Sequence, residues 1–129
     1  MARTHLDVAA TFTAPAVDAW RLLTDTRTWP QWGPTVTAVD TEPTVIGPGS
    51  TGRLRTPGGL WLPFTITTFD PGSRWSWRVA GIPATGHRVE ATDRGCRIVF
   101  EVPRFSAPYT VVCRVALRRM GHLLATGPP

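Results

Sequence analysis

Three side chains in this sequence could supply acid, base or polar chemistry from inside a fold: His87, Tyr109 and Arg53. Histidine titrates near neutrality, so His87 could act as a general acid or base, or it could be a hydrogen-bonded core residue. Tyr109 could offer its phenol to a ligand. Arg53 shares a strand face with Arg55 and could hold an acidic ligand if that face pointed inward, although a solvated face is the simpler interpretation.

Other familiar catalytic arrangements are missing from the sequence. No nucleophile stands with a base and an orienting group, and neither a His-Glu-x-x-His pattern nor paired cysteines at zinc spacing occur. The glycine-rich segment 47–52 joins two predicted strands, so it lacks the helix N-terminus that attracts phosphate. The sequence therefore predicts no metal and no cofactor.

The hydrophobic pattern predicts the elements that position these residues. Alternation with a period of two predicts strands at residues 4–12, 36–41, 51–56, 60–67, 74–79, 87–92 and 97–102. Helical spacing predicts two short helices at 15–24 and 28–32 and a longer terminal helix at 109–125. Tight turns join the later strands, so these strands should pair antiparallel, because parallel pairs need long crossovers.

These elements predict an α+β fold in one domain, residues 1–129. One face of an antiparallel sheet must be covered, and the long apolar stripe of the terminal helix is the best candidate to cover it. We therefore expect a curved antiparallel sheet of about seven strands wrapped around the C-terminal helix, with two short helices after the first strand.

Four residues add expectations about individual strands and the terminal helix. Pro63 cannot donate to a strand ladder, so its strand should lie at a sheet edge or carry a bulge at that point. Gly121 should weaken the terminal helix by roughly 1 kcal/mol relative to alanine. Cys96 and Cys113 are expected as small buried side chains, one on a strand and one on the helix.

The helix-facing side of the sheet should form the wall of any internal cavity. Trp75 and Trp77 present two indoles on one strand face, which could contact a ligand, although ordinary core packing against the terminal helix is the simpler interpretation. Trp29 and Trp32 are expected at the end of the sheet, bordering the pocket mouth. The predicted ligand-binding residues are Trp75, Trp77, Leu54, Phe64, Ile66, Val89, Ile98, Phe100, Val112, Ala116 and Met120, with His87 on the same face.

Several short motifs carry a resemblance to a known family. They are Thr13-Ala14-Pro15, Leu22-Leu23-Thr24-Asp25, Trp32-Gly33-Pro34, the segment 47–52 and Phe69-Asp70-Pro71-Gly72 before Arg74-Trp75. Over residues 3–125 the chain resembles the polyketide cyclase/dehydrase branch of the START and birch-pollen-allergen (SRPBCC) superfamily. The resemblance implies a helix-grip fold, whereas the members' ligands and reactions are diverse.

Composition limits the range of partners. All fourteen basic residues are arginine and the net charge is +5, but the arginines are dispersed, so nucleic-acid binding is not favoured. No apolar run approaches the length of a membrane span, and the N-terminus lacks the apolar core of a signal peptide, so we expect a cytoplasmic protein. The expected partner is a small apolar ligand, and the sequence leaves a homodimer open.

Two functions are compatible with these observations. The first is the binding of a small apolar, aromatic or lipid-like metabolite in the cavity, which requires no catalytic group. The second, implied by the resemblance, is a polyketide cyclase, aromatase or dehydratase that folds a reactive chain in the same cavity and supplies one acid or base. In that case His87, Tyr109 and Arg53 are the candidate catalytic residues.

Overall fold

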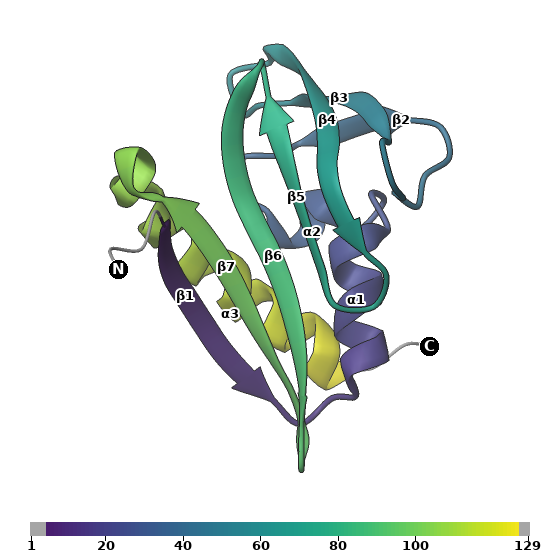
Figure 1. The fold of residues 1–129 in the computed structure, drawn as a ribbon, viewed down its shortest axis with the longest axis vertical. Coiled ribbons are helices and arrows are strands. Elements are labelled where there is room, and N and C mark those ends of the chain that lie inside the picture. The colour runs from purple at the N-terminus through teal and green to yellow at the C-terminus, as the bar shows by residue number, and fades with distance from the viewer. Residues whose placement is uncertain (1–4, 127–129) are drawn as a thin grey trace.

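A computed structural model describes residues 5–126 of the chain (Figure 1). Thr4, where the first strand was predicted to begin, lies outside the described residues. In chain order the elements are β1 (His5–Phe12), α1 (Ala16–Thr24), α2 (Trp29–Trp32), β2 (Ala38–Thr41), β3 (Thr51–Arg55), β4 (Trp61–Asp70), β5 (Arg74–Val79), β6 (Ile82–Thr92), β7 (Gly95–Pro103), the 3₁₀ segment η1 (Arg104–Tyr109) and α3 (Thr110–Thr126).

The seven strands form one antiparallel sheet in the order β1-β7-β6-β5-β4-β3-β2. Every neighbouring pair except β1 and β7 is consecutive in the chain, and the connections are short apart from residues 42–50 between β2 and β3. The sheet curves, and Figure 1 shows all three α-helices on the same side of it. The predicted α+β helix-grip arrangement is confirmed.

The largest difference from the predicted elements is in β6. This strand begins at Ile82, five residues before the predicted start at His87. Pro83 and Gly86 obscure the alternation in this segment, because both residue types are rare in strands. The consequence is functional, since the residues added to the strand include Thr85, which faces the interior.

Pro63 lies in β4, an interior strand, so the predicted edge position is wrong. The irregularity in β4 occurs between Ile66 and Thr68, not at the proline. The carbonyl of Pro63 accepts a hydrogen bond from the backbone N–H of Ala80 at 2.8 Å, just after the end of β5 at Val79. The nitrogen and the carbonyl of a strand residue point to the same side of the strand, so the nitrogen of Pro63 also faces Ala80. Because β5 has ended there, the missing N–H of Pro63 interrupts no hydrogen bond between the two strands.

Gly121 allows a close contact between α3 and β1. A Cβ atom at this position would lie 3.1 Å from Cε1 of Phe12, tighter than ordinary van der Waals contact. The helix therefore loses some intrinsic helix propensity at Gly121 and accommodates the Phe12 ring in return. Cys96 on β7 and Cys113 on α3 are both free and buried, as predicted.

The outer face of the sheet carries a cluster of charges centred on Glu101. This carboxylate is 6% exposed and accepts hydrogen bonds from Arg74 (Nη2–Oε1 2.6 Å) and Arg88 (Nη1–Oε2 2.5 Å). Burial by itself would raise the pKa of Glu101, but the hydrogen bonds and charges of the two arginines outweigh burial and lower it. Gly86 makes room for this cluster, since a Cβ there would lie 2.5 Å from Oε1 of Glu101.

Gly86→Ala should therefore destabilise the protein by roughly 1–3 kcal/mol, because the new methyl group would displace the Glu101 carboxylate from Arg74. The free energy of unfolding in urea provides the measurement. Gly58→Ala is the matched control, because a Cβ at Gly58 meets no atom within 4 Å. It should change stability by no more than about 0.5 kcal/mol. Equal effects of the two substitutions would show that Gly86 is not required for the ion cluster.

Candidate functional site

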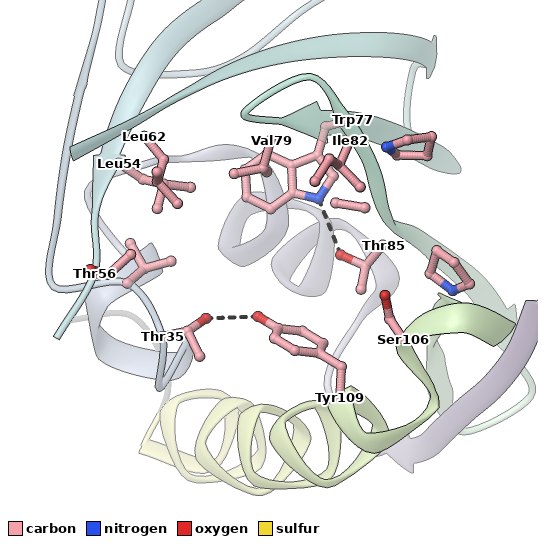
Figure 2. Close-up of a pocket in the computed structure, with 14 residues that line it drawn as sticks. Thr35, Leu54, Thr56, Leu62, Trp77, Val79, Ile82, Thr85, Ser106 and Tyr109 are labelled. Atoms are coloured by element: carbon pink, nitrogen blue, oxygen red, sulfur yellow. Dashed lines mark hydrogen bonds between the residues drawn. The ribbon is translucent and has the colours of Figure 1, made fainter. Parts of the chain in front are cut away.

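A cavity of about 310 Å³ lies between the sheet and the start of α3 (Figure 2). One wall comes from β3, β4, β5 and β6, and the opposite wall comes from η1 and the segment that follows α2. Fourteen residues line it: Thr35, Val36, Leu54, Thr56, Leu62, Trp77, Val79, Ile82, Pro83, Ala84, Thr85, Pro103, Ser106 and Tyr109.

None of these fourteen residues carries a charge. The walls are mostly aliphatic and aromatic, and the polar side chains among them are hydroxyls and the indole of Trp77. An ionised ligand group placed here would lose its hydration without meeting an opposite charge, which is strongly unfavourable. The cavity therefore suits an uncharged molecule that can form a few hydrogen bonds.

Two hydroxyls meet across one side of the cavity. The Tyr109 and Thr35 oxygens are 2.7 Å apart, although the residues are 74 positions apart in sequence, and Figure 2 shows the bond between them. Burial raises the pKa of Tyr109, so its phenol is protonated at neutral pH and can donate a hydrogen bond but does not act as a base.

A second polar group is built around Thr85, which is 6% exposed. The indole Nε1 of Trp77 donates to the Thr85 hydroxyl at 3.1 Å, a contact visible in Figure 2. The same hydroxyl lies 2.9 Å from Nε2 of His87. Nδ1 of His87 lies 3.3 Å from the backbone carbonyl of Trp75, so both nitrogens of the imidazole have partners.

His87 is a neutral core residue in this structure. It is 3% exposed, and its ring stacks on Trp75 with the centroids 3.8 Å apart. Burial lowers the pKa of His87 to about 3, and the carbonyl of Trp75 and the charge of Glu101 only partly oppose this effect. Of the two predicted roles, the hydrogen-bonded core residue describes this environment, and the geometry gives no support to an acid or base role.

A narrow inner extension of about 40 Å³ lies beneath the main cavity. Trp29 and Trp32 line it, so these residues lie deeper than the predicted position at the mouth. The indoles of Trp29 and Trp75 stack with centroids 5.6 Å apart, and Trp29 donates to the Leu23 carbonyl. The ring stack and the hydrogen bond together fix the position of Trp29 at the floor of the cavity.

Two further groups of the inner extension bear on its chemistry. Nε1 of Trp75 is buried and has no hydrogen-bond partner among the residues that the structure describes. Cys113 also lines the extension, but burial raises the pKa of its thiol to about 12. A thiol with such a pKa is protonated at neutral pH and is a poor nucleophile.

The predicted lining residues fall into three groups. Leu54, Trp77 and Tyr109 reach the main cavity. The inner extension is lined by Trp75, Trp77, His87, Phe100, Tyr109, Val112 and Ala116. The remaining predicted residues are buried on the expected face but pack in the core, where helices cover the sheet, and line neither space: Phe64, Ile66, Val89, Ile98 and Met120.

Arg53 lies on the outer face of β3, so its predicted contact with a ligand is wrong. Its Nε is 3.1 Å from Oδ2 of Asp40, and its guanidinium lies 4.6 Å from the centre of the Trp61 ring. The alternation of β3 directs Leu54 inward and its two arginine neighbours outward. The solvated interpretation of this face is the correct one.

Sequence reasoning missed Thr85, Thr35 and Ser106. Thr85 had a usable signal, because it precedes His87 by two residues and therefore shares its strand face once β6 is extended to Ile82. Thr35 and Ser106 lie outside the strands and outside the α-helices, where no periodicity indicates which way a side chain points.

Comparison with known proteins identifies the family. Residues 3–123 match the family described as polyketide cyclase / dehydrase and lipid transport. The chain belongs to this family. The match covers nearly all of the chain, including every strand and most of α3.

Individual proteins are similar to this chain in sequence or in structure. The Mycobacterium tuberculosis protein Rv2574 is 32% identical over 90 residues, which are 63% of this chain and 53% of that protein. This chain thus spans about half the length of the curated relatives it matches. The crystal structure of MLL2253 from Mesorhizobium loti superposes with a TM-score of 0.79 at 13% identity, covering 97% of this chain and 99% of that one.

DynU16, a protein from the dynemicin biosynthetic locus, superposes with a TM-score of 0.71 at 18% identity. The alignment covers 99% of this chain and 49% of DynU16. At such identities these similarities establish the shared fold. Within residues 5–126, no helix is long and apolar enough to cross a membrane, and no cluster of three or more His, Cys, Asp or Glu side chains could hold a metal ion.

The buried imidazole predicts a pH dependence of stability. Between pH 6.5 and about 3, the unfolded chain binds a proton at His87 that the folded chain does not bind. The stability that the neutral state of His87 contributes to the fold is therefore complete above pH 6.5. It is lost as the pH falls, by at most about 1.4 kcal/mol per pH unit. Urea unfolding at pH 7 and pH 5 should show a loss of roughly 2 kcal/mol from this residue.

His87→Gln should remove this loss between pH 7 and pH 5, a range above the titration of most carboxylates. His122→Gln is the matched control, because it replaces an exposed imidazole on α3 and leaves His87 in place. The control should retain the loss of stability. An identical pH response of wild type and His87→Gln would contradict the neutral, buried state of His87.

Proposed function

We propose that this domain binds a small, uncharged aromatic or largely apolar metabolite in the cavity between the sheet and η1, the segment that leads into α3. The observation that carries the proposal is the 310 Å³ cavity with fourteen uncharged lining residues and hydroxyls at two of its sides. Its volume lies at the lower end of the range typical of small-molecule sites.

The composition of the walls supports an aromatic ligand. Trp77 and Tyr109 present ring surfaces, and Leu54, Leu62 and Val79 supply aliphatic contact around them (Figure 2). Rings pack well against such surfaces, and the hydroxyls would fix the orientation of the molecule without balancing a charge. The family description, which names both polyketide processing and lipid transport, is consistent with a ligand of this kind.

Val79→Phe should fill part of the cavity and weaken binding about tenfold or more, since losing 1.4 kcal/mol of contact already costs that factor. Native mass spectrometry and thermal shift would be measured against neutral two- and three-ring aromatic compounds, each beside its carboxylate analogue. Val111→Phe is the matched control, because Val111 is 60% exposed on α3, and it should bind like the wild type.

Wild type should prefer the neutral member of each pair. Binding of the carboxylates in preference, or equal binding by Val79→Phe and Val111→Phe, would exclude this cavity as the site of an uncharged ligand.

A second candidate function is favoured by the hydroxyl pair. The protonated Tyr109 phenol, 2.7 Å from Thr35, is a hydrogen-bond donor at the rim of a mostly apolar cavity, where Tyr109 is 36% exposed. It would be suited to stabilise the oxygen of a carbonyl under attack in a polyketide-type cyclisation. DynU16, which has the same fold, comes from a biosynthetic locus, and this origin is consistent with such a role.

Under this second function, Tyr109→Phe should lower the cyclisation rate of a synthetic poly-β-ketone thioester by about 100-fold, the lower end of the loss when one hydrogen-bond donor to a developing oxyanion is removed. Its binding should change little. Thr56→Val removes a different hydroxyl from the same cavity and serves as the control. Wild type that binds the thioester without accelerating its cyclisation would leave only the binding function.

A further inference from the structure

We propose that Thr85 presents only a hydrogen-bond acceptor to the cavity, so that the site selects a ligand carrying a donor, such as a phenol or alcohol. His87 is the positioning residue that fixes this polarity. The inference rests on the proposed binding function and narrows its ligand class.

The acceptor character of Thr85 follows from assigning the hydrogens in the contacts that link the Trp75 carbonyl, His87 and Thr85. The carbonyl of Trp75 can only accept, so Nδ1 of His87 carries the hydrogen in their 3.3 Å contact. A neutral imidazole has one N–H, and therefore Nε2 is an acceptor. Thr85 lies 2.9 Å from Nε2 and must donate its single hydroxyl hydrogen there.

The remaining capacity of Thr85 is that of an acceptor. Its oxygen has two lone pairs, and one of them receives the N–H of Trp77 at 3.1 Å. One lone pair is left for the cavity that Thr85 lines. A ligand O–H placed against it completes the network, whereas an ether or ketone oxygen would face another acceptor.

The environment of His87 keeps this arrangement in one state. Three aromatic rings surround the imidazole: Trp75 at 3.8 Å, Phe100 at 5.3 Å and Trp77 at 5.8 Å between centroids. A protonated ring would have to donate from both nitrogens, which would reverse the bond to Thr85. Burial among these rings opposes that charge, so the hydroxyl hydrogen of Thr85 stays directed at His87.

The opposite side of the cavity has a different capacity. Tyr109 and Thr35 have two hydroxyl hydrogens between them and use one in their mutual bond. The second hydrogen remains available, so this pair can donate as well as accept. A ligand with a donor at one end and an acceptor-only oxygen, such as a ketone or ether, at the other would therefore bind in one orientation, with its donor toward Thr85.

The test compares two probes of similar shape, 2-naphthol and 2-methoxynaphthalene, by quenching of tryptophan fluorescence and by calorimetric titration. Wild type should bind 2-naphthol about tenfold more tightly, although the ether is the more apolar compound. Thr85→Val, which preserves the shape of the side chain, should reduce the preference to about twofold or less. Thr56→Val, in the same cavity, should retain it.

His87→Phe distinguishes a positioning role from a structural one. Removing Nε2 frees the Thr85 hydrogen to point into the cavity, so affinity for 2-methoxynaphthalene should rise several-fold, a gain that simple loss of packing would not produce. Equal binding of both probes by wild type, or a preference untouched by Thr85→Val, would overturn the inference and leave cavity binding standing. Failure of both probes and of the neutral aromatic panel to bind would overturn the proposed function itself.

Discussion

A curved sheet cannot pack closely against a single straight helix along its whole width, and this constraint governs the molecule. The contacts of α3 with the sheet concentrate on β1 and β7. Toward β3 and β4 the sheet bends away, and α2 fills part of the gap with Trp29 and Trp32, which pack on Phe64, Trp75 and Phe100. The space that these indoles leave is the cavity.

The same aromatic layer controls the polar chemistry of the site. Because His87 lies among rings, it is kept neutral, and because one of its nitrogens is bound to the backbone of Trp75, its tautomer is set by the sheet. The hydroxyl of Thr85 then has a defined orientation without contact with any charged group. A backbone carbonyl thus determines a property of the cavity surface through two side chains, and the buried ion cluster at Glu101 stays on the opposite face.

The fold was largely predictable from the sequence, because a period of two fixes the face to which each side chain points. Every residue predicted to point inward on β3 to β7 does so, from Leu54 to Phe100. Alternation carries no information about what covers each stretch of that face, so it could not separate the core position of Ile98 from the cavity position of Trp77. Nor could it find Thr35 and Ser106, whose positions depend on tertiary packing of irregular segments.

The Thr35–Tyr109 contact has a consequence for how this fold diversifies. It joins two non-repetitive segments at the rim, whereas the walls are paired strands whose register constrains every neighbour. Insertions or substitutions at the rim can therefore reshape the entrance without shifting the strands behind it. A paired-strand scaffold with an adjustable border is compatible with backbones that superpose at a TM-score of 0.79 with only 13% identity.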